Sequence, residues 1–537
     1  MKMKKVISIA LALVLAIGLL AGCNSGGSTS EAAKNFSETD EKLTIEWLGY
    51  ATLSGCSEGT QPELLLEEKF NVEIKPIFYE TEKFNDKKTM LMAGGDIPDL
   101  LYELDPLNVY NDVDQEFIVE LPYETIEKYA PEYFNFIKEY SPAAWSYARY
   151  EDANWGIPNL NYFNEFPMVH AYRGDWLEKV GKEVPTTLDE MHDVLYSFVY
   201  DDPDGDGKDD TFGYSMIMPL WSYFFPEFFG AYGVIPFNWQ EVDGEIVYGG
   251  LREECTEVLQ ILQDWYKEGL IHPDFAIGTA QDTLATTDKI GFIQMVTYQN
   301  EADPTSQINT IRQVVPGASY VYTANPYGPD GLRGNKVWGA PCHVVSFGAT
   351  EQYGVAVPRM LQILEGMFTD DELMKKVALG NEGEHYIEYD KATSTDTMIL
   401  QSTPEYANNN DRRLAGITNT LHGPSFFTPI TPHKDLYLDT MSDGYREWLE
   451  KYAPADAALA DVFYKVDIVP SAADYLLDLR NKQMKLMADI IQGVKSADSY
   501  IPEFTEIWSK GGGDILLEEA RTHKEVIDDM YKELGIK

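Results

Sequence analysis

The sequence predicts an α/β protein in which helices cover parallel-rich sheets. Two strand-like stretches, 43–50 ("LTIEWLGY") and 70–79 ("FNVEIKPIFY"), come early, and amphipathic helical stretches fill the spaces between such segments. This alternation of strand and helix is typical of sheets whose faces are covered by helices. Hydrophobic residues make up 44% of the 537 residues, as in globular chains. A chain of this length can build two or three sizeable cores.

The N-terminus has the pattern of an exported lipoprotein. A basic "MKMKK" precedes the apolar run "VISIALALVLAIGLL", which leads into "LAGC" at Leu20 to Cys23. The apolar run has fifteen residues, too few for a helix that spans a bilayer. Small residues directly before a cysteine resemble the bacterial lipobox, which implies that residues 1–22 are a signal peptide and that Cys23 is lipidated. Two or more acyl chains would then hold the protein on the extracellular face of the cell membrane.

The next segment and the overall charge limit the possible partners. Residues 23–41 are small and polar, which predicts a flexible tether. The chain has 42 Lys and Arg against 88 Asp and Glu, a net charge of −46, which would repel nucleic acid, anionic lipid surfaces and polyanionic ligands. Besides Cys23, the widely spaced Cys56, Cys255 and Cys342 show no metal-binding pattern, so we interpret them as free thiols or one incidental disulfide.

An acidic loop, "DDPDGDGKDDTFGYS" at Asp201 to Ser215, resembles half of an EF-hand. Counted from Asp202, loop positions one, three, five and nine carry carboxylates, and Gly207 stands at position six, where a calcium loop turns sharply. Position seven would contribute a backbone carbonyl, and position twelve is Gly213 where an EF-hand has a bidentate Glu. The expected calcium ligands are Asp202, Asp204, Asp206, the Lys208 carbonyl and Asp210.

The flanks of this loop favour a structural ion over a switch. Before it, Thr187 and Glu190 form a capping box, and apolar residues at helical spacing follow up to Val199. After it, "TFGYSMIM" alternates and is rich in strand formers, so there is no second helix to open on calcium binding. The alternative is a solvated acidic turn, because Pro-Asp-Gly-Asp-Gly is ordinary turn chemistry.

Further along the chain, turn signals and aromatic residues mark candidate ligand contacts. In "GGDIPD", the glycines end a helix before the strand "LLYEL", and we expect Asp96 in the following loop to face a ligand cleft. Flat aromatic faces beside polar groups suit the apolar face and hydroxyl fringe of a sugar ring. Aromatic residues are abundant, and most pack in a core, as we expect for Trp176. Tyr50, Trp221, Tyr298 and Trp338 stand in loops after strands and are the leading candidate sugar platforms.

A series of motifs resembles the extracellular solute-binding proteins of bacterial ABC transporters, of the sugar-binding type. They are "LMAGGDIPDLL" from Leu91, "NWGIPN" from Asn154, "YRGDWLEKVGKEVPTTLDEM" from Tyr172, "DWYKEGLIHPDF" from Asp264 and the C-terminal "GGGDILLEEA". Each motif is weak alone, but their order and spacing cover nearly the whole mature chain. Long oligosaccharide-binding members, such as the LipO-like and alginate-binding types, are similar in carrying an acidic loop at this place, which strengthens the calcium prediction. Such members often have an acidic residue after the last loop aspartate, where this chain departs from the pattern and has Thr211 as the candidate sixth ligand.

The resemblance implies a two-lobed fold of the periplasmic-binding-protein (Venus flytrap) type, with the ligand cleft between the lobes. It implies residues 42–165 and 341–400 in the first lobe, and residues 166–340, with the calcium loop 202–211, and 401–537, with the C-terminal helices, in the second. Asn159 and Arg173 flank the first crossing and are the expected polar partners of the sugar; Arg173 could equally pair with a carboxylate.

The function implied is oligosaccharide capture by closure of the lobes, followed by delivery to the permease subunits of an ABC importer. We expect a monomer without enzymatic activity. The alternative is a lipid-anchored glycoside hydrolase, whose two carboxylates the acidic composition could supply, and a peptide-binding lipoprotein is a further alternative. The sequence contains no HExxH or GxxxxGK[ST] motif, so ATP hydrolysis would belong to a separate subunit.

Overall fold

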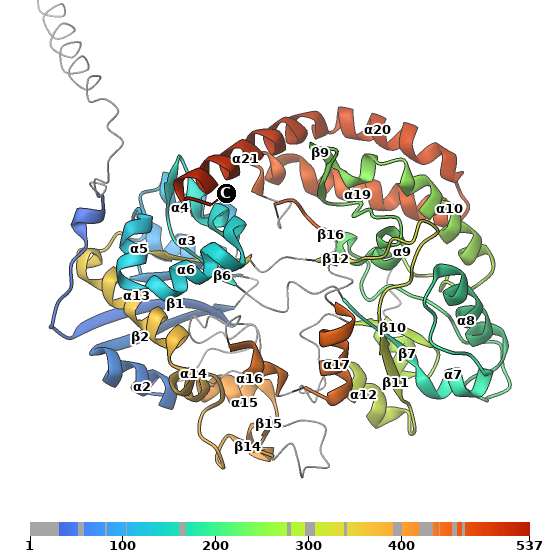
Figure 1. Ribbon diagram of the computed structural model, residues 1–537, viewed down its shortest axis with the longest axis horizontal. Coiled ribbons are helices and arrows are strands. Elements are labelled where there is room, and N and C mark those ends of the chain that lie inside the picture. Colours follow the sequence, from blue (N-terminus) through green and yellow to red (C-terminus); the bar gives the residue numbers. More distant parts are fainter. Residues whose placement is uncertain are drawn as a thin grey trace, which may run out of the picture.

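The protein has a two-lobed α/β fold, seen here in a computed structural model (Figure 1). The structure describes residues 32–51, 58–80, 83–103, 105–160, 168–276, 281–295, 307–337, 341–389, 400–417, 433–439, 441–453, 459–463 and 468–536. The first lobe, on the left of Figure 1, is built on a five-stranded sheet, and the second lobe is built on a three-stranded sheet.

The sheet of the first lobe has the strand order β2-β1-β3-β13-β6. Strands β1, β2 and β3 are parallel, whereas β13 is antiparallel to both of its neighbours. The strands are β1 (Leu43–Ala51), β2 (Val72–Glu80), β3 (Leu100–Glu103), β13 (Pro341–Phe347) and β6 (Ile157–Leu160). The predicted strands at 43–50 and 70–79 are therefore confirmed, and they pair with each other along their full length.

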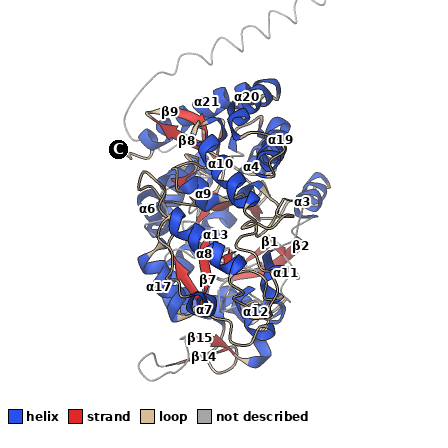
Figure 2. Ribbon diagram, turned by 90° about the vertical axis from the view of Figure 1, so that its right-hand side faces the viewer, coloured by secondary structure: helices blue, strands red, loops and turns tan. Residues whose placement is uncertain are grey.

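Helices pack around this sheet, as expected for an α/β lobe (Figures 1 and 2). Helix α3 ends at Ala93, and Gly95 follows with a φ of 94°, so the predicted glycine stop before β3 is confirmed. The helices are α2 (Gln61–Phe70), α3 (Phe84–Ala93), α4 (Pro106–Asp114), α5 (Tyr123–Tyr129), α6 (Pro131–Tyr140), α13 (Tyr353–Thr369) and α14 (Asp371–Leu379).

The sheet of the second lobe has the order β10-β7-β11 and is antiparallel. The strands of this sheet are β10 (Phe292–Met295), β7 (Val169–Arg173) and β11 (Tyr320–Thr323). The main helices of the second lobe are α7 (Gly174–Val180), α8 (Leu188–Tyr200), α9 (Pro226–Gly230), α10 (Glu254–Lys267), α11 (Gln281–Thr286), α12 (Gln307–Val314) and α17 (Asp443–Lys451). Thr187 caps α8, because its Oγ1 accepts a hydrogen bond from the Glu190 amide at 3.2 Å. The Glu190 carboxylate in turn accepts a hydrogen bond from the Thr186 amide at 2.7 Å, so Thr187 and Glu190 both take part in the cap.

The chain passes between the sheets at several points. It leaves the first sheet after β6 and enters the second at β7, and it returns from β12 (Lys336–Val337) to β13. Strand β12 pairs in parallel with β16 (Leu459–Ala460) in the region between the lobes (Figure 1). Two small hairpins, β8 (Trp239–Val242) with β9 (Glu245–Tyr248) and β14 (Tyr386–Glu388) with β15 (Leu400–Ser402), complete the named sheets along with β4 (Arg149–Tyr150) and β5 (Ala153–Asn154).

The region after residue 400 differs from the predicted assignment to the second lobe. Helices α15 (Asn409–Leu414) and α16 (Lys434–Leu438) lie beside α14 of the first lobe (Figure 1). His433 Nε2 lies 2.9 Å from the Met367 carbonyl of α13, and His433 Nδ1 lies 3.2 Å from the Asp371 carboxylate of α14. These contacts are long-range in sequence, so local pattern gave no sign of them.

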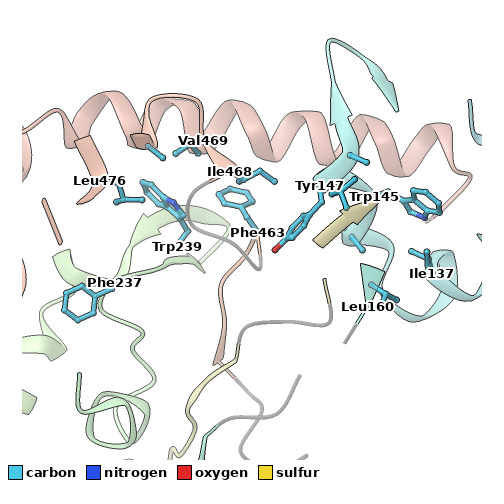
Figure 3. Packing of buried hydrophobic residues seen from close by; sticks show 14 of the residues in the cluster. Ile137, Trp145, Tyr147, Leu160, Phe237, Trp239, Phe463, Ile468, Val469 and Leu476 are labelled. Atoms are coloured by element: carbon cyan, nitrogen blue, oxygen red, sulfur yellow. The ribbon is translucent and has the colours of Figure 1, made fainter. Parts of the chain in front are cut away.

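Three C-terminal helices span both lobes along one side of the molecule (Figure 1). They are α19 (Ala472–Ile491), α20 (Tyr500–Lys510) and α21 (Gly513–Glu533), and the last one buries an apolar face at Leu516, Ala520, Ile527 and Met530. Below them, one hydrophobic core runs from Trp145 and Tyr147 of the first lobe to Trp239 and Phe463 near the second (Figure 3). This shared core joins the lobes on the side opposite α16 and α17.

Candidate functional site

One edge of the first sheet faces the second lobe, and we call it the inter-lobe edge. Leu160 at the end of β6 pairs with Pro341 at the start of β13, and both strands connect from there to the second lobe. Because β1, β2 and β3 run parallel to β6, their carboxyl ends lie at this same edge. Ligands of open α/β sheets bind at the carboxyl ends of strands, so this edge is the candidate site.

Partly exposed rings that the sequence analysis did not select lie at the inter-lobe edge. Tyr79 pairs with Tyr50 at the ends of β2 and β1. Tyr102 at the end of β3 lies against His343 of β13, with ring centroids 5.1 Å apart. Their place at the site depends on strand order, which no local pattern shows.

The predicted ligand residues of the first lobe separate into two groups. Asn159 lies at the inter-lobe edge, opposite His343, and is 5% exposed. Asp96 is exposed in the loop before β3, at the opposite end of the sheet, so the expectation that it faces the cleft was wrong. A loop that follows a helix leads into the amino end of a parallel strand, whereas ligands lie at the carboxyl end.

A buried ionic cluster supports the carboxyl end of β3. Lys88 Nζ of α3 lies 2.5 Å from the Glu103 carboxylate of β3 and 2.6 Å from the Asp112 carboxylate of α4. All three side chains are almost completely buried, at 4% exposure or less. Burial raises the pKa of Glu103, and the Lys88 ammonium counteracts this rise. The cluster fixes two helices to the strand that carries Tyr102.

In the second lobe, β7 begins at the inter-lobe side and runs away from it. Near its start, His170 is buried together with Glu227 of α9, and their Nε2 and Oε2 atoms are 3.8 Å apart. Gln294 of β10 donates to Glu227 at 2.5 Å and to the Tyr214 hydroxyl at 2.9 Å. Burial raises the pKa of Glu227 to about 7 and lowers the pKa of His170 to about 3, so His170 is neutral at physiological pH.

Arg173 lies at the far end of β7, away from the inter-lobe edge. Its guanidinium is 2% exposed and pairs with Asp175 at 2.7 Å and with Asp288 at 2.5 Å. It also lies over the ring of Trp176, which is fully buried in the core as predicted. Of the two roles considered for Arg173, the structure supports the carboxylate pair and places the residue away from the inter-lobe edge.

Trp221 lies beside the crossing strand β12, in the short helix η5 (Trp221–Tyr223). The Lys336 ammonium of β12 is 4.1 Å from the centroid of its ring, and the Arg480 guanidinium of α19 is 3.7 Å away. The ring therefore combines an apolar surface with two cationic hydrogen-bond donors. A sugar stacked on this ring would have to displace one of the two cations, and sequence pattern gave no sign of this arrangement.

The remaining candidate platforms are Tyr50, Tyr298 and Trp338. Tyr50 is at the end of β1, at the inter-lobe edge, and its backbone pairs with Tyr79. Tyr298 and Trp338 lie outside the described residues, as do the predicted signal peptide, Cys23 and Cys56. Cys255 is a buried free thiol. No helix among the described ranges is long and apolar enough to cross a membrane.

The acidic loop after α8 brings three predicted calcium ligands together. Carboxylate oxygens of Asp202, Asp204 and Asp206 lie within 4.8 Å of one another. The backbone supports this arrangement, because the Gly207 amide donates to Asp202 and the Asp206 amide donates to Asp204. The residue types and the turn therefore fit a calcium ion. The segment after the loop forms only isolated bridges at Phe212 and Tyr214, not the predicted strand.

Lys289, which the sequence analysis missed, reaches the same carboxylates from the second lobe's β10 side. Its ammonium lies 2.7 Å from Asp204, 3.0 Å from Asp206 and 2.5 Å from Asp210. The hydrogen bonds from Lys208 and Lys289 lower the pKa of Asp206 to about 2. Thr211, the candidate sixth ligand, is buried and donates its hydroxyl to the Phe198 carbonyl at 2.7 Å.

Comparisons with known proteins agree with this architecture. No family model matches the chain. In sequence it is similar to lipoprotein LipO of Bacillus subtilis (strain 168), with 28% identity over 279 residues, 50% of this chain and 51% of LipO. It is also similar to the polygalacturonan/rhamnogalacturonan-binding protein YtcQ of the same organism, with 25% identity over 398 residues, 72% of this chain and 75% of YtcQ. The chain thus matches about half the length of LipO.

Solved structures show the same fold. The alginate-binding protein AlgQ2, solved without calcium ion, matches with a TM-score of 0.63 and 15% identity over 91% of this chain and 99% of that chain. The ABC-transporter substrate-binding protein FusA of Streptococcus pneumoniae, in complex with kestose, matches with a TM-score of 0.62 and 16% identity over 90% of this chain and 100% of that chain. The fold and the sequence relatives agree with the resemblance seen in the motifs: this chain is similar to solute-binding proteins, among them the ABC-transporter substrate-binding protein FusA.

Proposed function

We propose that this protein is the lipid-anchored solute-binding component of an ABC importer, which captures an oligosaccharide between its lobes and delivers it to membrane permease subunits. The observation that carries this proposal is the inter-lobe edge, where Tyr102, His343 and Asn159 of one lobe face the lobe that carries Trp221 and Lys336. Aromatic faces beside hydrogen-bonding groups suit a sugar ring. The names of YtcQ and FusA, a polysaccharide-binding protein and a fructooligosaccharide transporter subunit, support a carbohydrate ligand.

Closure of the lobes would complete the site. Contacts made by both lobes at once exist only in the closed state, so a ligand that makes them shifts the population toward closure. A permease can then distinguish the loaded receptor from the empty one. A lipid on Cys23 and a tether over 23–41 would keep the receptor at high effective concentration near the permease.

A panel of oligosaccharides tests the binding function. The mature protein is incubated with fructooligosaccharides, oligogalacturonates and peptides, and both the melting temperature and the integrity of each compound are measured. We expect an oligosaccharide to raise the melting temperature and to remain intact. Shortened products would support the glycoside hydrolase alternative, and a shift caused by peptides alone would support the peptide-binding alternative.

Variants at Trp221 test the proposed site itself. If the Trp221 ring stacks on sugar, Trp221→Ala should weaken sugar binding by about 1–3 kcal/mol. The matched control is Tyr196→Ala, which removes an exposed ring on α8, outside the inter-lobe edge. Equal sugar affinities of the Trp221→Ala variant and the wild type would place the site elsewhere.

We propose that the acidic loop binds calcium as a structural ion, through Asp202, Asp204, Asp206, the Lys208 carbonyl and Asp210. The clustered carboxylates support this, as do the names of two structural neighbours, AlgQ2 without calcium ion and an EF-hand mutant of FusA. Hard oxygen ligands at this spacing suit calcium. EDTA should lower the melting temperature of the wild type but not that of Asp204→Ala. If EDTA changes the melting temperature of neither protein, the loop is a solvated turn that binds no calcium.

We propose that Cys23 carries the lipid anchor. The basic n-region, the short apolar run and the "LAGC" sequence support it, as does the name of the relative LipO. In a Cys23→Ala variant the protein should remain unprocessed or appear in the culture medium. Mature wild-type protein found free in the medium, without acyl mass on its N-terminal peptide, would contradict the anchor.

A further inference from the structure

The second lobe contains an aromatic pocket that the inter-lobe edge does not include. It lies between α12, β11 and α17, along the whole length of α17, and its volume is about 620 Å³. Ligand pockets for small molecules typically have volumes of about 300–1,000 Å³. The aromatic lining residues are Tyr320, Tyr322, Trp448 and Tyr452, and the polar ones include Arg312, Ser442 and Glu447.

The register of β11 separates this pocket from the inter-lobe edge. Tyr320 pairs with Arg173 at the far end of β7, and Tyr322 pairs with Ala171 at the middle of β7. Arg173 lies three positions after His170 along β7, which corresponds to about 10 Å. Every lining residue belongs to the second lobe, so the pocket is complete without lobe closure.

The rings of the pocket are held in place before any ligand arrives. The Trp448 indole donates to the Thr323 carbonyl of β11 at 2.8 Å. Tyr445 packs edge-on against Tyr322, with centroids 5.8 Å apart and an interplanar angle of 90°. Fixed rings lose little conformational entropy on binding, which favours affinity.

Gly444 leaves the ring of Tyr322 accessible at the start of α17. A Cβ added at Gly444 would lie 3.5 Å from two carbons of this ring, at ordinary van der Waals distance. Gly444 is exposed, and its backbone is not in the left-handed region. A larger side chain at this position would therefore cover the ring without straining the helix.

We propose that this pocket is a second carbohydrate site, which takes one sugar ring against Tyr322 and Tyr452. A ligand with one apolar face and several hydroxyls matches rings that stand beside Arg312 and Glu447. The class of ligand rests on the proposed function, because a receptor for long oligosaccharides gains avidity from a second contact with the same polymer. The site holds such a chain before the lobes close.

The experiment measures sugar binding by the mature protein with kestose and trigalacturonate, by saturation-transfer NMR and calorimetry. We expect binding at two sites, of which Gly444→Leu abolishes one and leaves the other unchanged. Tyr452→Ala should weaken binding at the pocket by about 2- to 10-fold, the loss expected for one ring contact. The matched control is Glu450→Leu, on the same helix and exposed but outside the lining.

The outcomes separate this inference from the proposed function. If the wild type binds either sugar, and both pocket variants bind it with the affinity and stoichiometry of the wild type, the pocket does not bind sugar. That result overturns the second site and leaves the proposed function standing. If Trp221→Ala loses one site while the pocket variants lose the other, both proposals hold. If the wild type binds neither sugar, both fail for these ligands. Melting temperatures show whether each variant is folded, and Tyr452→Ala decides the outcome should Gly444→Leu unfold.

Discussion

The stability of this protein depends on the pairing of its buried charged side chains. Lys88 is enclosed with Glu103 and Asp112, whereas Lys69 and Asp370 form a pair of similar length, 2.5 Å, at the surface. Loss of one partner in a buried pair leaves an uncompensated charge in a medium that solvates it poorly. Loss of a surface pair only returns its partner to water.

We therefore expect Lys88→Met to lower the free energy of unfolding by about 3–5 kcal/mol, because two buried carboxylates lose their cation. The control Lys69→Met, at a site where both side chains are about 40% exposed, should cost less than about 1 kcal/mol. Urea unfolding of both variants measures the difference. Equal costs would mean that the Lys88 cluster is accessible to water.

Glu227 should make stability depend on pH. Burial raises its folded pKa to about 7, above the ordinary value of 4.5, so its contribution is fully present below about pH 4.5 and is lost as the pH rises through 7. Between these values the wild type should lose about 1.4 kcal/mol per pH unit relative to Glu227→Gln, which still accepts from Gln294 but does not titrate. Urea unfolding between pH 5 and pH 7 measures the slope, and parallel curves would contradict the raised pKa.

In the acidic loop, the Lys289 ammonium and a bound calcium ion would compete for the same carboxylates. Lys289 bonds Asp204, Asp206 and Asp210, the residues that calcium would need. Burial tends to lower the pKa of Lys289, but the three carboxylates raise it overall, so the ammonium stays charged. An internal cation of this kind stabilises the loop without calcium and lowers the gain from binding calcium.

Lys289→Met should accordingly lower the melting temperature in EDTA and increase the rise in melting temperature that calcium produces, because the aspartates then repel one another until an ion binds. Lys208→Met is the matched control: its ammonium contacts Asp206 alone, its side chain is 68% exposed, and its carbonyl ligand is retained. Calorimetric scans with and without calcium measure both effects. Identical calcium shifts in the wild type and Lys289→Met would mean that calcium binds elsewhere or not at all.

For the whole molecule, the lobes share one core on the side of the C-terminal helices (Figure 1). On the other side, α16 of the first lobe meets α17 of the second, where the Arg446 guanidinium donates to the Leu438 carbonyl at 3.3 Å. The Arg149 guanidinium of the first lobe contacts Glu533 at the end of α21 at 2.8 Å, which anchors this helix to both lobes. The shared core along the C-terminal helices is the joint about which a hinge motion would move the lobes, with the smaller α16–α17 contact changing as they move.

Sugar binding should therefore reduce the radius of gyration in small-angle scattering, because the inter-lobe contacts form only when the lobes approach. The control is a sugar of equal size that causes no melting shift, which should leave the scattering unchanged. Saturation with a tightly bound sugar and no change in radius would show that the lobes are already closed or that the ligand binds within one lobe.

The sequence by itself determined features whose causes lie within a few residues. The cap at Thr187, the glycine stop after α3 and the half EF-hand turn follow from local backbone and side-chain chemistry. The ordered motifs also predicted the two-lobed fold, since a family resemblance carries tertiary information that periodicity lacks.

Only the tertiary structure decided which of these features meet. Asp96 and Asn159 have similar loop signals, but strand direction places them at opposite ends of one sheet. Lys289 reaches carboxylates 79 to 85 residues away in sequence, and Trp221 meets Arg480 of a C-terminal helix. Such contacts depend on strand order and on packing between distant segments, and no local pattern encodes them because their free energy is gained only when the chain is folded.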